Sequence, residues 1–269
     1  SNRIRPEHAH TPLVIMTVLI QLSVGALTAM QWATLLHRLE ITIAVVLVGQ
    51  IALGFSLLHL GRPAFAWRAL KMWKQSWLSR EVLLLSLYAG ASGALLPLLL
   101  VPSSLTRATT MAALVFGWAG LWASANIYLV SARPAWNMPA TIADFLLTAC
   151  LLGPVVVLMA DPKNSLLHTV AMGAAIAQLA NQLWKLLAMR HSLVFEMKAS
   201  ARLLTGRLQR PFAWRMFLGL AGILFLAMNL FTAALALLLA AELLGRYLFF
   251  VSVVPKNIAS TFIGMKKVA

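Results

Sequence analysis

Two titratable side chains border one polar connection between two apolar runs of this 269-residue chain. One apolar run ends at His59 and the next begins at Glu81, so both groups are expected where hydrocarbon meets lipid headgroups. Histidine titrates near neutral pH, and a carboxylate can carry a proton onward. The pair could therefore handle a hydrophobic substrate that carries protons. Both side chains could also simply reach water from the interface, with Glu81 favouring the N-terminus of its helix.

The connection between these two residues also carries cations and indoles that could shape a pocket. It holds five Lys and Arg residues and three tryptophans. Arg62 could hold the shape of a pocket or polarise a bound headgroup, and Trp67, Trp73 and Trp77 could wall it. Tryptophans also collect at membrane interfaces as an aromatic belt, and that interpretation accounts for these three equally well.

A second pair of ionisable residues lies inside the last apolar run. Glu242 and Arg246 are one helical turn apart, on one face of a helix. Burying either charge alone in a membrane costs about 2.5 to 3.5 kcal/mol, so the two are expected to pair. The pair could be structural, or it could contribute to a pocket or a proton path. Four polar residues of other runs are expected to bond between helices: Asn126, Gln178, Asn181 and Gln182.

The elements that position these residues are helices that span a membrane. The chain is 61% hydrophobic and 11% charged. Long apolar runs must be helical in hydrocarbon, because each backbone polar group has to be satisfied within its own segment. We expect a single all-α membrane anchor domain over residues 1–269, with a tight hairpin at Asn229. Its eight predicted helices cover residues 13–36, 41–59, 82–101, 105–130, 141–160, 166–187, 216–228 and 231–254.

The distribution of charge predicts the orientation of the chain. Its net charge is +15, and the cations lie in short connections between apolar runs, which favours a membrane protein over a nucleic-acid-binding one. Both termini share one side with every Lys and Arg except Arg38, Arg107, Lys163 and Arg246. The positive-inside rule makes that side cytoplasmic. Residues 190–215 are predicted to form an amphipathic interfacial segment, which could anchor to headgroups or bind a partner.

The chain offers few ligands for a redox centre. Its single cysteine, Cys150, cannot build a thiolate-ligated iron–sulfur cluster. Haem held by two histidines needs both at membrane depth, but His8, His10 and His191 lie outside the predicted spans. The two remaining histidines, His37 and His168, lie on the side opposite His59. We therefore expect neither haem nor an iron–sulfur cluster in this chain.

Three strings resemble a known family: HLGRP at residues 59–63, SWLSRE at residues 76–81 and ELLGRYLFF at residues 242–250. They resemble the membrane anchor subunit of the dimethyl sulfoxide reductase type, the DmsC family. The resemblance implies a quinol-binding subunit in the bacterial inner membrane, used in anaerobic respiration. It further implies a ferredoxin-like [4Fe–4S] subunit and a molybdopterin catalytic subunit as partners, and it implicates His59 and Glu81 in menaquinol handling.

Three functions remain open at this point. A quinol site fits the chemistry, because quinol oxidation releases two electrons and two protons and needs a proton acceptor near the hydroxyl. A transporter or proton-conducting channel would instead predict inverted repeats or charges spread through the midplane. A passive scaffold would need none of these groups. The sequence does not distinguish menaquinone from ubiquinone, or one direction of electron flow from the other.

Overall fold

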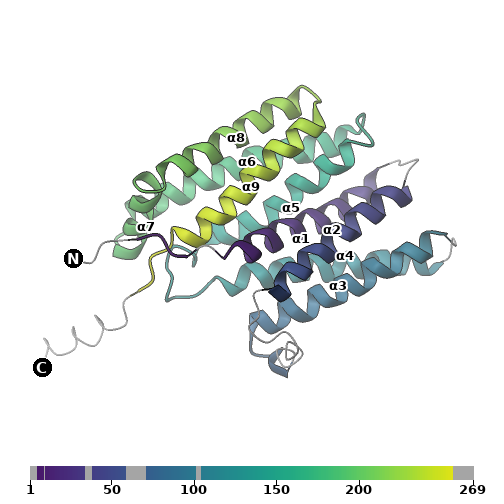
Figure 1. Cartoon of the computed structure of the whole chain (residues 1–269), viewed down its shortest axis with the longest axis horizontal. Coiled ribbons are helices and arrows are strands. Elements are labelled where there is room, and N and C mark those ends of the chain that lie inside the picture. The colour runs from purple at the N-terminus through teal and green to yellow at the C-terminus, as the bar shows by residue number, and fades with distance from the viewer. Residues whose placement is uncertain (1–4, 9, 34–37, 59–70, 101–103, 257–269) are drawn as a thin grey trace, which may run out of the picture.

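The computed structural model describes residues 5–8, 10–33, 38–58, 71–100 and 104–256, and these residues form helices without any strand (Figure 1). The predicted all-α class is confirmed. The helices are α1 (Thr11–Ala29) with a short 3-10 turn η1 (Met30–Trp32), α2 (Arg38–Leu58), α3 (Trp77–Leu100), α4 (Ser104–Ile127), α5 (Pro139–Leu158), α6 (Ser165–His191), α7 (Phe195–Thr205), α8 (Gln209–Ala227) and α9 (Phe231–Val251).

Each of the eight predicted spans corresponds to one long helix, and α7 is the additional short one. Six helices are long and apolar enough to cross a membrane, namely α1 with η1, α3, α4, α5, α8 and α9. The other two long helices, α2 and α6, pack within the same bundle, which is consistent with eight spans. The hairpin between α8 and α9 turns at Asn229, whose φ of 59° is the left-handed conformation that asparagine tolerates better than most residues.

Several segments meet at one end of the bundle, which we call the basic end. It comprises residues 5–8, the start of α3, the connection 128–138, α7 and the end of α9 (Figure 1). Backbone hydrogen bonds join these segments, from Glu7 to Val251 at 3.0 Å and from Lys256 to Ala132 at 2.9 Å. Both ends of the described chain therefore lie at the basic end, as the even number of spans predicts.

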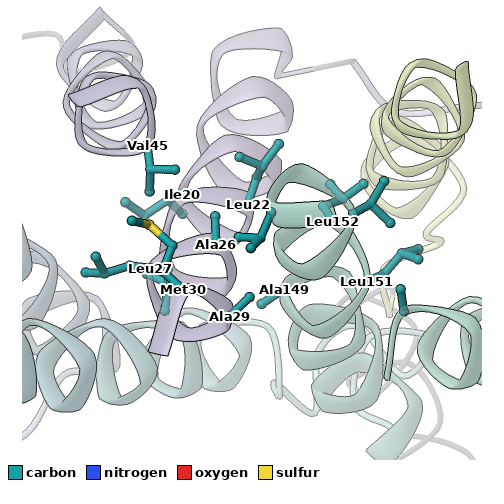
Figure 2. Packing of buried hydrophobic residues seen from close by; sticks show 14 of the residues in the cluster. Ile20, Leu22, Ala26, Leu27, Ala29, Met30, Val45, Ala149, Leu151 and Leu152 are labelled. Atoms are coloured by element: carbon teal, nitrogen blue, oxygen red, sulfur yellow. The ribbon is translucent and has the colours of Figure 1, made fainter. Parts of the chain in front are cut away.

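Helix α1 forms the centre of the bundle and packs on α2, α4, α5 and α9. It approaches α5 most closely at Gly25 and Gly153, where a Cβ on Gly25 would collide with the Ala149 carbonyl oxygen. Figure 2 shows the small side chains Ala29 and Ala149 where these two helices meet. Helices in lipid associate through such small residues, because no hydrophobic force drives them together.

The basic segment after α6 folds into the amphipathic helix α7. Its apolar face, including Leu203 and Leu204, is buried against the bundle, and Arg202 on the same helix is exposed. Arg207 and Arg210 beyond it are also exposed. The predicted amphipathic helix is confirmed, and its cations are placed to meet either lipid headgroups or a partner.

Candidate functional site

Glu81 lies inside α3, whose first residue is Trp77, and is buried with 8% of its surface exposed. The hydropathy pattern places it instead at the edge of the span, one residue before Val82. Its carboxylate lies near the Ser124 hydroxyl of α4, which is buried and makes no hydrogen bond of ordinary length within the described part of the chain. His59, Arg62 and Trp67 lie outside the described residues. The structure thus places one member of the predicted pair, a buried carboxylate near the basic end.

Arg80 contacts the segment that carries Trp73 and Trp77. Its guanidinium stacks 4.4 Å from the ring centre of Trp77 and donates hydrogen bonds to the carbonyl oxygens of Trp73, at 3.0 Å, and Lys74, at 2.7 Å. Trp73 and Trp77 remain 49% and 39% exposed. Their rings therefore offer an aromatic surface at the start of α3.

Glu242 is the deepest carboxylate of a polar network that joins α5, α6, α8 and α9. Its Oε2 accepts hydrogen bonds from Thr148 Oγ1 at 2.5 Å and from Gln178 Nε2 at 2.8 Å. Its Oε1 lies 3.6 Å from the guanidinium of Arg215. Gly245 makes room for that guanidinium, because a Cβ at Gly245 would collide with Arg215 Nε. The glycine of the ELLGR string therefore lets an arginine from α8 enter the bundle.

Asp144 anchors the outer part of the same network. Lys185 Nζ lies 3.6 Å from Asp144 Oδ2, and both side chains are about nine-tenths buried. The other carboxylate oxygen accepts from the amides of Asn181, at 3.3 Å, and Gln182. Asp144 is thus a buried ion-pair partner as well as a carboxylate near the start of its helix.

Arg246 does not pair with Glu242, so the pairing that their spacing predicts is wrong. Its guanidinium donates to Gln21 Oε1 of α1 at 3.0 Å and stacks 3.7 Å from the ring centre of Phe145. Both ionisable residues instead find partners on other helices, because α8 and α1 pack on α9 and offer Arg215 and Gln21. A partner on another helix also adds to helix association, which a pair within one helix would not.

Sequence reasoning misses one feature of the two cations that complete this network, namely their burial. The sequence analysis counts Lys185 and Arg215 among the cations of the basic side, but they lie within α6 and α8 and are only 8% and 5% exposed. One signal is present for Lys185, which shares a helix face with Gln178 and Gln182 at spacings of seven and three residues. For Arg215 the sequence offers only its place next to an apolar run.

The predicted interhelical hydrogen bonds are confirmed for Gln178, Asn181 and Gln182. The prediction was wrong for Asn126, whose amide donates to the Trp122 carbonyl of its own helix at 2.7 Å. Within the described ranges, no group of three or more His, Cys, Asp or Glu side chains is arranged to hold a metal ion. The ring of His168, far from the basic end, bonds to the Leu226 carbonyl at 3.1 Å.

Comparison with known proteins relates the chain to membrane anchors of molybdoenzymes. The family model described as DMSO reductase anchor subunit (DmsC) matches residues 7–251. The chain is also similar to the C subunit of the sulfite dehydrogenase of Allochromatium vinosum, with 35% identity over 111 residues. That alignment covers 35% of this chain and 33% of the relative, so it spans about a third of either protein.

Proposed function

Since the chain belongs to the DmsC family of membrane anchor subunits, we propose that it binds a quinol at the basic end and oxidises it for a molybdenum-dependent respiratory oxidoreductase. The family places the chain in a membrane and in complexes with catalytic molybdoenzyme subunits. The observation that carries the quinol proposal is the buried carboxylate of Glu81. It lies in the helix that directly follows the connection containing His59 and Arg62.

The proposed site follows from two requirements of the substrate. The isoprenoid tail of a quinol stays in hydrocarbon, whereas its ring must reach both a proton exit and an electron acceptor outside the membrane. A site at the edge of the bundle meets both requirements. His59 accepts the proton from the quinol hydroxyl, Glu81 receives protons next, and Arg62 positions the ring. Trp67, Trp73 and Trp77 wall the pocket, and Glu242 with Arg246 supports its inner side. Menaquinol is the substrate that the family resemblance favours.

Electrons leave the chain for another subunit. One cysteine in the whole sequence cannot hold a cluster, so the acceptor is proposed to be a ferredoxin-like [4Fe–4S] subunit. That subunit would pass electrons to the molybdopterin catalytic subunit. The exposed cations around α7 and the indoles before α3 lie at the same end and offer this partner a surface to bind.

The opposite direction of electron flow is a second candidate. The relative from Allochromatium vinosum belongs to a sulfite dehydrogenase, an enzyme that removes electrons from its substrate. If this chain serves a similar complex, the same site would reduce a quinone and take up protons. Two assays of the purified complex distinguish the two directions of electron flow. In one the complex is given sulfite and a quinone, and in the other a quinol and dimethyl sulfoxide, and the pair that reacts identifies the direction.

We further propose that the basic end faces the cytoplasm in the bacterial inner membrane. The helix count keeps both termini on this side. Burial of Lys185 and Arg215 lowers the number of cations at the surface, but the bias of the remaining ones is still large. Single cysteines at each terminus should be labelled from the cytoplasmic face of sealed vesicles. Labelling of either terminus from the other face would contradict this orientation.

Glu81→Gln is expected to slow quinol-dependent turnover of the complex by about a hundredfold, because the amide cannot accept a proton. The side chain keeps its size, so the complex should still assemble. The matched control is Glu196→Gln, at the first turn of α7, which should leave turnover unchanged. Steady-state quinol oxidation by both purified variants tests this, and unchanged turnover in Glu81→Gln would remove Glu81 from the site.

A further inference from the structure

Five ionisable side chains are buried together at the basic half of the bundle, more than a quinol pocket requires. They are Asp144, Lys185, Arg215, Glu242 and Arg246, each less than a tenth exposed. Glu242 lies nine residues before the end of α9, about 14 Å along the helix axis. Ionisable groups at such depth pair with one another and mark routes for ions or protons.

Two small cavities accompany these side chains. The outer one has a volume of about 30 Å³ and is lined by Asp144, Lys185 and Arg215, with Trp136 and Ser252 toward the basic end. The inner one, of about 10 Å³, is lined by Arg215, Glu242 and Gln178. On the same measure of volume a water molecule needs roughly 10 to 15 Å³ and polar partners, so both cavities are suited to water. Arg215 lies between them and borders each.

A buried polar atom without a partner borders the inner cavity. Gln178 Oε1, at the inner cavity, makes no hydrogen bond within the described part of the chain. Gln21 Nε2 and Arg246 Nε, whose residues line neither cavity, also have no partner there. Buried groups of this kind are normally satisfied by ordered water. A water in the inner cavity would satisfy Gln178 Oε1 beside Glu242.

Tyr128 connects this network with Glu81. It follows α4, four residues after Ser124, whose hydroxyl lies near the Glu81 carboxylate. Its ring packs on Phe145, Phe249 and Trp136, at centre distances of 5.5, 5.2 and 5.3 Å. Tyr128 thus follows the neighbour of Glu81 by four residues and packs on Phe145, the ring on which Arg246 stacks.

We propose that this network is a hydrated proton route between Glu81 and the water at the basic end, with Glu242, Asp144 and Lys185 as its titratable members. The proposal rests on the proposed function. When a quinol is oxidised, its two O–H bonds break and two electrons pass to the iron–sulfur subunit. The two protons move from Glu81 past Tyr128 and through the outer cavity, and leave beside Trp136, which contacts Tyr128 and lines that cavity. Reduction of a quinone would use the same route inward.

The test compares Asp144→Asn with the doubly neutral Asp144→Asn/Lys185→Gln in the whole complex. The single variant leaves the buried Lys185 cation without its carboxylate, which could prevent folding. The double variant removes both charges, so neither is left unpaired and the test can still be made. Both variants are expected to reduce quinol turnover at least tenfold without changing the affinity for a quinone analogue. A small weak acid such as azide should restore much of the lost turnover, which a purely structural role would not permit. The matched control, Asp161→Asn at the opposite end of the bundle, should behave as the unaltered complex.

Two results would overturn the route. Unchanged turnover in both assembled variants would assign the ion pairs to structure, and so would loss of assembly in the single and the double variant alike. Failure of the proposed function would look different, because the unaltered complex would then neither bind the quinone analogue nor oxidise quinol. The route, which depends on that function, would be rejected with it.

Discussion

Arg215→Met is expected to destabilise the folded chain by about 3 to 5 kcal/mol, since it leaves the buried carboxylate of Glu242 without its cation. Methionine fills much of the space that the arginine side chain occupies, so lost packing contributes little. The matched control is Arg210→Met, an exposed position in the first turn of the same helix. The difference in stability between the two variants is measured by heating the detergent-purified chains and monitoring the loss of the monodisperse peak in size-exclusion chromatography.

The double variant Arg215→Met/Glu242→Gln separates charge from shape. It removes both charges, so most of the lost stability should return. The amide oxygen of the new glutamine could still accept hydrogen bonds from Thr148 and Gln178. A double variant as unstable as Arg215→Met would show that the arginine stabilises the bundle by packing, not by pairing with Glu242.

His59→Ala is expected to lower quinol-dependent turnover by about a hundredfold, because the site loses the group that accepts the first proton. Assembly should be unaffected, since a side chain at the interface does not hold the bundle together. Electron transfer from an artificial donor that feeds the soluble subunits directly should persist. His191→Ala, at the end of α6 near the same surface, is the control.

Two outcomes would argue against this role of His59. Loss of assembly in His59→Ala would make the histidine structural. Unchanged quinol turnover would make it a bystander, and the site would then have to lie closer to Glu242 and Arg246.

The helices of this protein were predictable because each backbone polar group in hydrocarbon must form its hydrogen bond within its own segment. Apolar runs identified all eight long helices. Asn229 identified the turn between α8 and α9, two helices that composition alone would have merged into one. The ends of the helices were less predictable. Two predicted spans begin just after a charged residue, at residues 82 and 216, whereas α3 and α8 begin earlier and contain Glu81 and Arg215. Glu81 and Arg215 were therefore assigned to the membrane surface, as was Lys185 close to the end of its predicted span, although all three side chains are buried.

The partners of buried charges could not be read from spacing. Glu242 and Arg246 are one turn apart, yet their contacts depend on which neighbours α9 packs against. Arg215 reaches Glu242 only because α8 crosses α9 at Gly245, and Gln21 reaches Arg246 only because α1 is central. Interhelical packing of this kind is a property of the folded bundle, which no local pattern in the sequence encodes.

The most direct test of the central claim is a binding titration of the purified complex with a quinone analogue. The unaltered complex is expected to bind one analogue per chain, and His59→Ala and Glu81→Gln should each weaken binding at least tenfold while the subunits remain assembled. Equal affinity in the unaltered complex and both variants would contradict a quinol site at the basic end.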